Sequence, residues 1–369
     1  MPPRVAHIIA PAPIGGAEAV VRALSKATLR SGREVWIVAL LDGGGDHPFV
    51  VQARADGTPV IEVRCGRRRY LSEARRVGDA LRELAVELVH THVYHADLVG
   101  YLAARRARLP VVATLHGYAG GDPRNRLYEW LDRKLLARFD AVLCVSEAQR
   151  EQMRRSGCAP ERLAVVPNGH ASGSLLPRAE ARARLGLAAT QVAFGWIGRL
   201  SFEKGPDLFV EALARLGPGG GLGVVIGEGA ERRRVEARAR ALGLGEHRLR
   251  FAGFRGDAPS LLAAFDALVI SSRTEGLPVV LLEAIAAGTP VVAFAVGGIP
   301  DVLGTASGWL APAGDVDGLA RALRSLLEDP REAQKRACEA KRLLASRFGV
   351  ERWLEQVDGV YARALAGPR

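Results

Sequence analysis

Short apolar runs rich in β-branched residues alternate with longer segments of helical periodicity along most of the chain. This alternation is typical of parallel sheets covered by helices, whose buried strands are apolar on both faces. In the first half, the pattern predicts strands at 4–10, 34–40, 59–64, 87–93, 110–116, 141–146 and 162–167. In the second half, it predicts strands at 191–198, 222–227, 249–254, 267–272, 290–295 and 308–312, followed by helices only.

Residues 170–188 interrupt the alternation, because they contain no strand-like run and many small or turn-forming residues. The sequence therefore predicts an α/β protein with two doubly wound, Rossmann-like domains that face each other across a cleft. We place the first domain at 1–172, the second at 173–345 and a C-terminal helix at 346–369. Ligands of such sheets bind beyond the carboxyl ends of the strands. We therefore expect the functional residues in the loops that follow the strands.

The composition allows two packed cores but weakens any argument from charge. Of the 369 residues, 48% are hydrophobic, and the formal net charge is +11. Only five of the 51 basic residues are lysines, a skew that we attribute to GC-rich coding bias. A nucleic-acid surface needs a concentrated basic patch with aromatic side chains, so we expect no nucleic-acid partner. The densest basic cluster, at 64–70, is short, and we interpret it as a contact for an anionic lipid or phosphorylated acceptor, or equally as a solvated loop.

Cysteine usage and hydropathy favour a cytoplasmic protein. The four cysteines show neither close pairing nor metal-type spacing, which fits a reducing compartment. The first 16 residues make a poor signal peptide and a good first strand. The chain contains no uninterrupted apolar run of 18 residues, so we predict no membrane span. Contact with the inner face of a membrane stays compatible with these features.

The apolar segment 273–292 contains two glutamates, Glu275 and Glu283, seven residues apart. A buried carboxylate without a partner costs several kcal/mol, so these residues need an explanation. We place Glu275 in the loop after a strand and Glu283 in the second turn of a buried helix. Hydroxyl groups are suitable partners, since a carboxylate can accept two hydrogen bonds from a vicinal diol. An arginine within the fold would explain Glu283 but not Glu275.

The loop after the first strand of the second half contains two cations, Arg199 and Lys204, and Pro206 is expected to start the next helix. Cations at the amino end of a helix oppose its dipole, and a bound diphosphate would remove the conflict. The alternative is a salt bridge to Glu203 or a solvated loop. No G-K-[ST] sequence follows, so a P-loop is not indicated.

Glycines at other strand ends are weaker signals. Gly15 and Gly16 permit close approach of a ligand to the backbone, and Glu18 follows them in the helix. Gly227 ends a later strand and is expected only to line the cleft. The amides near Gly276 and Leu277 are expected to point into the same cleft as the two cations; these residues precede the helix that contains Glu283.

The segment 90–95, HTHVYH, suggests a metal site, because His90 and His92 share one strand face and His95 follows. No cysteine supports this interpretation, and Asp97 is the only close acidic residue. Histidines at strand ends more often bond hydroxyl groups. We therefore expect no metal here and expect His92 beside the ligand.

Taken together, these motifs resemble the retaining glycosyltransferases of family 4, which have the GT-B fold. The resemblance covers nearly the whole chain. Its most specific signal is the E-x7-E motif with its flanks, at 275–303. The other matching segments, in chain order, are GGAE at 15–18, HGY at 116–118, VSEAQ at 145–149, VPNG at 166–169, GRLSFEKG at 198–205 and GEG at 227–229.

The resemblance implies a role for each matching residue in binding a nucleotide diphosphate sugar. Glu283 would hold the ribose of this donor, and Glu275 would face its sugar. The diphosphate would be held by Arg199 and Lys204 and approached by the early glycine pair. The remaining expectations are His116 beside the reacting carbon, Gly198 and Gly227 at the donor, and Glu18, His92 and Asn168 on the acceptor side.

The resemblance also implies the domain roles and the reaction. The first domain would bind an acceptor hydroxyl of a glycan, lipid or small molecule, the second would bind the donor, and the C-terminal helix would cross back to the first domain. We expect transfer with retention by a same-face, ion-pair-like route that needs no metal or other cofactor. Two alternatives are a sugar-nucleotide epimerase of the same fold and a noncatalytic nucleotide-binding homologue. The sequence departs from the family at 168–172, where His170 replaces an apolar residue.

Overall fold

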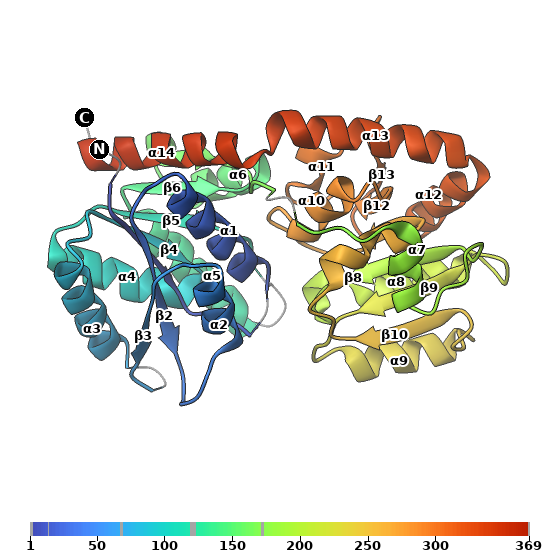
Figure 1. The fold of residues 1–369 in the computed structure, drawn as a ribbon, viewed down its shortest axis with the longest axis horizontal. Coiled ribbons are helices and arrows are strands. Elements are labelled where there is room, and N and C mark those ends of the chain that lie inside the picture. The colour runs from blue at the N-terminus through green and yellow to red at the C-terminus, as the bar shows by residue number, and fades with distance from the viewer. Residues whose placement is uncertain (1–2, 14, 67–68, 119–122, 171–172, 368–369) are drawn as a thin grey trace. The chain divides into compact units, whose positions relative to one another are not determined.

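The computed structural model describes residues 3–13, 15–66, 69–118, 123–170 and 173–367. These residues form two compact units, one at 1–169 together with 350–369 and the other at 170–349. Each unit is built on one parallel sheet with helices on its faces (Figure 1). The fold class predicted from the sequence is therefore confirmed.

The first unit contains a seven-stranded parallel sheet in the order β3-β2-β1-β4-β5-β6-β7. Every strand lies within a run predicted from the sequence, give or take one residue at its ends. The strands are β1 (Val5–Ile9), β2 (Val35–Leu41), β3 (Val60–Arg64), β4 (Leu88–His92), β5 (Val111–Leu115), β6 (Ala141–Cys144) and β7 (Leu163–Val165).

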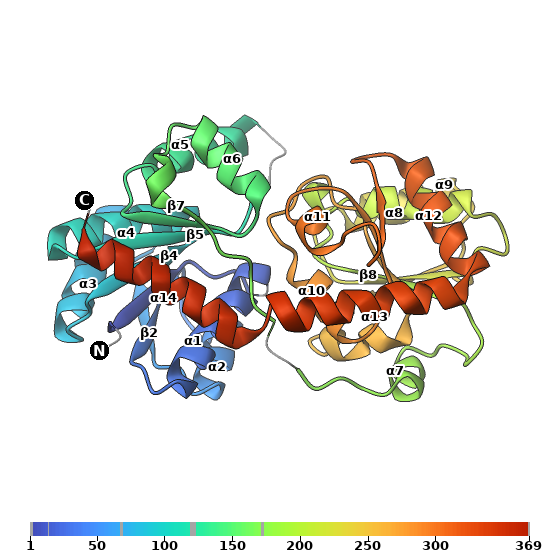
Figure 2. The ribbon, with the colours of Figure 1, turned by 90° about the horizontal axis from the view of Figure 1, so that it is seen from above.

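Helices cover both faces of this sheet. They are α1 (Gly16–Arg30), α2 (Pro48–Ala55), α3 (Tyr70–Glu83), α4 (Tyr94–Ala107), α5 (Pro123–Leu136), α6 (Glu147–Arg155) and α14 (Val350–Ala366). On one face, Gly100 of α4 packs against Ile8 and Thr91. On the other face, α14 lies beside α1 and contacts β5 and β6 (Figure 2). The last twenty residues of the chain therefore complete the first unit.

The second unit contains a six-stranded parallel sheet in the order β10-β9-β8-β11-β12-β13. Its strands are β8 (Ala193–Ile197), β9 (Leu222–Ile226), β10 (Leu249–Gly253), β11 (Ala267–Ile270), β12 (Val291–Phe294) and β13 (Trp309–Ala311). Its helices are α7 (Arg178–Arg184), α8 (Pro206–Arg215), α9 (Arg232–Ala241), α10 (Val279–Ala286), α11 (Ile299–Val302), α12 (Val316–Glu328) and α13 (Pro330–Arg347), and 3-10 turns span Phe202–Lys204 and Ala258–Ala264.

Local signals set the ends of α10 as the sequence predicts. Pro278 precedes the helix, and Gly288 follows it in the left-handed region with φ of 71°. The amide of Gly288 donates to Ile285, and that of Thr289 donates to Ala284, so the last carbonyls of the helix are capped. The helix is apolar on most of its surface, with Leu281, Leu282, Ala284 and Ile285 buried.

No helix among the described residues is long and apolar enough to span a membrane. The basic cluster at 64–70 includes Arg67 and Arg68, which lie outside the described residues. Within the described part of the cluster, Arg64 forms an ion pair with Glu62.

The hydrogen bond between Tyr361 of α14 and His90 of β4 yields a stability prediction. The Tyr361 hydroxyl lies 2.7 Å from Nδ1 of His90, and both side chains are buried. We expect Tyr361→Phe to destabilise the first unit by about 1–3 kcal/mol, because it leaves a buried nitrogen without its partner. Urea denaturation measures the effect. The matched control is Tyr101→Phe, since Tyr101 stacks on Phe139 and its hydroxyl has no hydrogen-bond partner among the described residues. Equal effects of the two variants would contradict the prediction.

Candidate functional site

The strand order of each sheet reverses at one place. In the first sheet β1 lies between β2 and β4, and in the second β8 lies between β9 and β11. The connections on the two sides of such a point run to opposite faces, which leaves space at the carboxyl ends of the two central strands. Loops after β1 and β4, and after β8 and β11, are therefore the expected ligand-binding positions.

In the second unit, this geometry joins Lys204 to Glu275. Lys204 lies in the loop after β8, and Glu275 lies in the loop after the neighbouring strand β11. The Lys204 Nζ atom is 2.7 Å from Oε1 and 2.8 Å from Oε2 of Glu275. Ser272 donates a third hydrogen bond to Oε1, at 2.7 Å. The carboxylate is 7% exposed and the lysine 28%, so this ion pair is well shielded from water.

The other cation of this loop, Arg199, also has a carboxylate partner. Its Nη2 atom lies 3.4 Å from Oε1 of Glu203, and its side chain is 62% exposed. An exposed pair at this distance contributes little to stability, which leaves Arg199 free to reorient toward a ligand. The structure thus shows the alternative salt bridge to Glu203, and binding of a diphosphate by the two cations stays a prediction. In the ligand-free fold, glutamates balance both charges.

Glu283 differs from Glu275, because no side chain among the described residues donates a hydrogen bond to its carboxylate or forms an ion pair with it. It projects from α10, a helix in which Leu281, Leu282 and Ile285 are buried. Burial raises the pKa of Glu283 from 4.5 to about 7. The sequence argument expected ligand hydroxyls as partners of both glutamates. The structure gives Glu275 an internal partner, Lys204, which the sequence did not reveal, and the alternative of an arginine partner for Glu283 is not found among the described residues.

Among the predicted glycines of the second unit, Gly227 is required by close backbone packing. Gly227 has φ of 143°, and a Cβ there would lie 1.9 Å from the carbonyl oxygen of Gly198. The Gly276 carbonyl accepts a 2.6 Å hydrogen bond from the amide of Gly298. Leu277, also predicted at the donor, is buried. Contact of these residues with a donor stays a prediction.

In the first unit, Glu18 organises the loop after β1. Its Oε1 atom accepts a 2.7 Å hydrogen bond from the amide of Ala12. A Cβ at Gly15 would lie 2.2 Å from Oε2 of Glu18, so only glycine fits at that position without rearrangement. Gly16 begins α1. Glu18 thus has a structural role that the sequence did not reveal, whereas Asn168, also predicted at the site, is simply buried.

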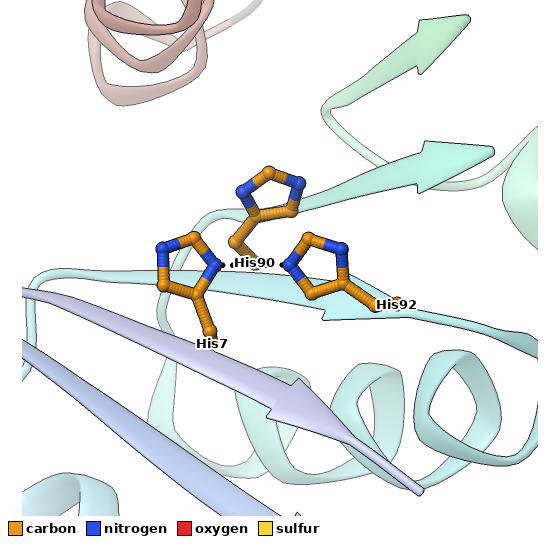
Figure 3. Close-up of side chains that lie close together, drawn as sticks. All are labelled: His7, His90 and His92. Atoms are coloured by element: carbon orange, nitrogen blue, oxygen red, sulfur yellow. Dashed lines mark hydrogen bonds between the residues drawn. The ribbon is translucent and has the colours of Figure 1, made fainter. Parts of the chain in front are cut away.

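A chain of three histidines crosses the carboxyl half of the first sheet. Nδ1 of His7 lies 2.9 Å from Nε2 of His92, and Nδ1 of His92 lies 2.9 Å from Nε2 of His116. Figure 3 shows the first of these hydrogen bonds, with His90 beside the two rings. Both ring nitrogens of His92 are therefore occupied. This contradicts the expectation that His92 bonds a ligand hydroxyl, because the strand pleat directs its ring into the sheet face rather than outward.

The histidine cluster in the structure differs from the metal site that the sequence suggested. His95 does not belong to it, since its Nε2 atom pairs with Glu73 at 2.8 Å. His7 replaces it, and potential ligand atoms of His7, His90 and His92 lie within 4.8 Å of one another. The sequence analysis missed His7, which lies on β1 and is aligned with His90 across the β1–β4 pair.

The structure also pairs two buried aspartates, and the sequence gave no indication of this pair. Asp97 of α4 and Asp132 of α5 are hydrogen-bonded to each other, and Tyr118 donates to Asp132 at 3.0 Å. Burial and mutual repulsion raise the pKa of Asp97 well above its ordinary value, and burial raises that of Asp132 to about 6. Their separation in sequence gave no signal of this pairing.

Two doubly wound sheets with charged loops at the switch point of the second define the chain as a GT-B glycosyltransferase. The family model for Glycosyltransferase Family 4 matches residues 14–170, and the model for Glycosyl transferases group 1 matches 177–343. The protein therefore belongs to family 4 of the glycosyltransferases.

Individual relatives agree with this assignment. The chain is 33% identical to 2-deoxystreptamine N-acetyl-D-glucosaminyltransferase of Streptomyces fradiae, over 76% of this chain and 73% of that protein. It is 31% identical to D-inositol 3-phosphate glycosyltransferase of Xylanimonas cellulosilytica, over 95% and 92% of the two chains. Among solved structures, Anabaena HepE in complex with UDP-glucose matches with a TM-score of 0.86 and 25% identity, over 98% of this chain and 99% of that one.

The raised pKa of Glu283 predicts a pH-dependent stability. Below pH 4.5 the carboxyl is protonated in both the folded and unfolded states and has no effect. Between pH 4.5 and about 7 the unfolded state loses the proton first, so stability falls as pH rises. We expect Glu283→Gln to remove this loss. The difference in free energy of unfolding between the variant and the wild type should therefore be up to about 3 kcal/mol more favourable to the variant at pH 8 than at pH 4.5.

Urea denaturation of the wild type and the variant between pH 4.5 and 8 measures this difference. Glu246→Gln, at an exposed position, is the matched control for losing one negative charge. Identical pH profiles for the wild type and Glu283→Gln would show that the carboxylate is not desolvated.

Proposed function

We propose that this protein transfers a sugar from a nucleoside diphosphate sugar to an acceptor hydroxyl, with retention at the anomeric carbon and without a metal ion. The observation that carries the proposal is the contrast between two glutamates at one strand-end site. Glu275 is neutralised by Lys204, whereas Glu283 has no partner among the described residues. In the proposed site, a ligand supplies the hydrogen-bond donor that Glu283 lacks among the described residues.

A ribose fits this requirement. Its 2′ and 3′ hydroxyls can each donate to one carboxylate oxygen, which offsets the desolvation of Glu283. Binding would then lower the pKa of Glu283 toward its ordinary value, because hydrogen bonds favour the ionised form. A phosphate in the same position would be repelled. The nucleoside half of the donor is therefore assigned to Glu283.

The diphosphate is assigned to Lys204 and Arg199. Lys204 has three N–H donors, and Arg199 is exposed and weakly paired. The start of α10 adds backbone amides that lack intrahelical partners and the positive end of a helix dipole. Together these groups can stabilise the charge that develops on a departing diphosphate, which is the main demand of sugar transfer.

The arrangement favours substitution on one face of the sugar over a double displacement. A double displacement needs a free carboxylate as nucleophile. Glu275 is held on both oxygens by Lys204 and on one by Ser272, so it is better suited to orient sugar hydroxyls. In the proposed route, the departing phosphate accepts the proton of the acceptor hydroxyl, and His116 lies beside the reacting carbon.

The relatives support the proposed substrates. HepE is a solved structure with UDP-glucose, and two relatives are named for transfer involving 2-deoxystreptamine and inositol 3-phosphate. These names favour a small hydroxylated acceptor for this chain. An epimerase of the same fold would instead release nucleotide and an altered sugar without any acceptor.

Nucleotide binding is the first prediction of this proposal. We expect one of UDP, GDP, ADP, CMP and dTDP, at about one hundred times its Kd, to stabilise the wild type by ~2.7 kcal/mol. Thermal unfolding measures the shift, and Lys204→Ala and Glu283→Gln should each reduce it. Lys335→Ala, at an exposed ion pair, is the matched control and should bind normally. Absence of a shift with every nucleotide would favour the noncatalytic alternative.

Turnover provides the second prediction. Once the donor is identified, Lys204→Ala should lower kcat about a hundredfold or more, because one charge stabiliser of the leaving group is lost. Nucleotide binding should be partly retained. Initial rates with the accepted donor and a panel of hydroxylated acceptors measure this, with Lys335→Ala again as control. Near-normal turnover would refute the assignment of Lys204, and an inverted product would refute retention.

A further inference from the structure

We propose that His7 and His92 are positioning residues that set the tautomer of His116. In this arrangement, either all three rings have their proton on Nδ1 or all three have it on Nε2. The proposal rests on the proposed function in one respect, namely that His116 faces the donor sugar. The coupling between the rings rests on the first unit alone.

The strand register explains why these three histidines meet. The parallel pairs align His7 with His90 and His92 with Thr114, and His116 follows Thr114 by two residues. Side chains two residues apart on a strand share a face, so all of these side chains lie on one face of β1, β4 and β5. The chain thus runs across three neighbouring strands and ends at the carboxyl edge of β5.

Burial keeps every ring in the chain neutral. It lowers the pKa of His7 to about 3 and that of His116 to about 4, and together with the neighbouring histidines it lowers the pKa of His92 well below its ordinary value. A neutral imidazole has one N–H donor and one bare acceptor nitrogen. Each hydrogen bond in the chain therefore needs a donor nitrogen on one ring and an acceptor on the next.

Only two proton arrangements satisfy both hydrogen bonds. In the first, Nδ1 of His7 donates to Nε2 of His92, Nδ1 of His92 donates to Nε2 of His116, and His116 has its proton on Nδ1. In the second, every proton lies on Nε2 and both hydrogen bonds run in the opposite direction. The two states differ at Nδ1 of His116, which presents a donor in the first and an acceptor in the second.

Nδ1 is the ring nitrogen of His116 that remains available, because no described residue is hydrogen-bonded to it. His116 is only partly buried and directly follows β5, at the edge where ligands of parallel sheets bind. The proton arrangement shared with the buried His7 and His92 therefore sets whether His116 donates to a sugar hydroxyl or accepts from it.

A metal ion is the competing explanation for the histidines, and the contacts disfavour it. Both nitrogens of His90 already have partners, Tyr361 at 2.7 Å and Thr114 at 2.8 Å. Both nitrogens of His92 are used in the chain. Among the described residues, no carboxylate is hydrogen-bonded to His7, His90 or His92, so a divalent cation would be buried without a compensating charge.

Nitrogen NMR of the histidine rings tests the proposal directly, since the two tautomers give different shifts. Protein labelled with ¹⁵N in its histidines is compared with His7→Leu, His92→Leu and the packing control Val5→Ala, which lies on the same face of β1 as His7. In the wild type and the control, we expect His7, His92 and His116 to show one shared tautomer.

The variants then separate coupling from mere packing. In His92→Leu, His116 loses its partner, so we expect it to show a mixture of tautomers. In His7→Leu, His92 and His116 should both carry protons on Nδ1, because a buried bare nitrogen costs less than a buried N–H without a partner. This second variant decides the question if His92→Leu does not fold. Different tautomers on His92 and His116, or an unchanged His116 in folded His92→Leu, would overturn the proposal.

Two further measurements complete the test. Stoichiometric zinc in the purified protein, or visible bands on adding Co²⁺ that vanish in His90→Ala, would overturn the proposal in favour of a metal site. If the wild-type rings have their protons on Nε2, His7→Leu moves the proton of His116 to Nδ1, and kcat should fall about tenfold with little change in KM, consistent with one hydrogen bond lost at the sugar. If the wild-type rings already have their protons on Nδ1, His7→Leu should leave kcat within about twofold of the wild type. Shared tautomers without any sugar transfer would refute the proposed function alone, whereas transfer with different tautomers would refute this inference alone.

Discussion

The reversal of strand order within each sheet is the constraint on which the rest of the structure depends. It places the ends of β8 and β11 side by side in one unit, and the ends of β1 and β4 side by side in the other. Residues about 70 or 85 positions apart in sequence thereby come into hydrogen-bond contact. Both the Lys204–Glu275 pair and the His7–His92 contact exist for this reason.

Burial gives the strand-end groups their different properties. Glu275 is buried and paired with a lysine, whereas Glu283 has no partner among the described residues and burial raises its pKa to about 7. The same loss of water around His7, His92 and His116 lowers their pKa values and leaves the rings neutral. Neutral rings in series can share one proton arrangement, and a carboxylate without a protein partner can accept hydrogen bonds from hydroxyl groups. One physical effect thus underlies the chemistry that we propose for both groups.

The E-x7-E motif has a clear physical basis in this fold. Its first glutamate lies in the loop after β11. Its second lies in α10, the helix that follows this loop. The loop is fixed by tight backbone packing, since a Cβ at Gly297 would lie 2.1 Å from the carbonyl oxygen of Glu275. The spacing therefore holds one carboxylate against Lys204 and the other in the apolar surroundings of α10.

The sequence by itself determined the strands, the two-domain organisation and most of the candidate loops, because hydrophobic periodicity and turn residues act locally. It also placed Pro278 and Gly288 at the ends of α10. Only the tertiary structure decided which charges are paired, because it joined Glu275 to Lys204. It also placed His7 beside His92, so that hydrogen bonds with His7 and His116 occupy both ring nitrogens of His92. Hydrogen-bond partners depend on register across strands that are distant in sequence, and no local pattern encodes that register.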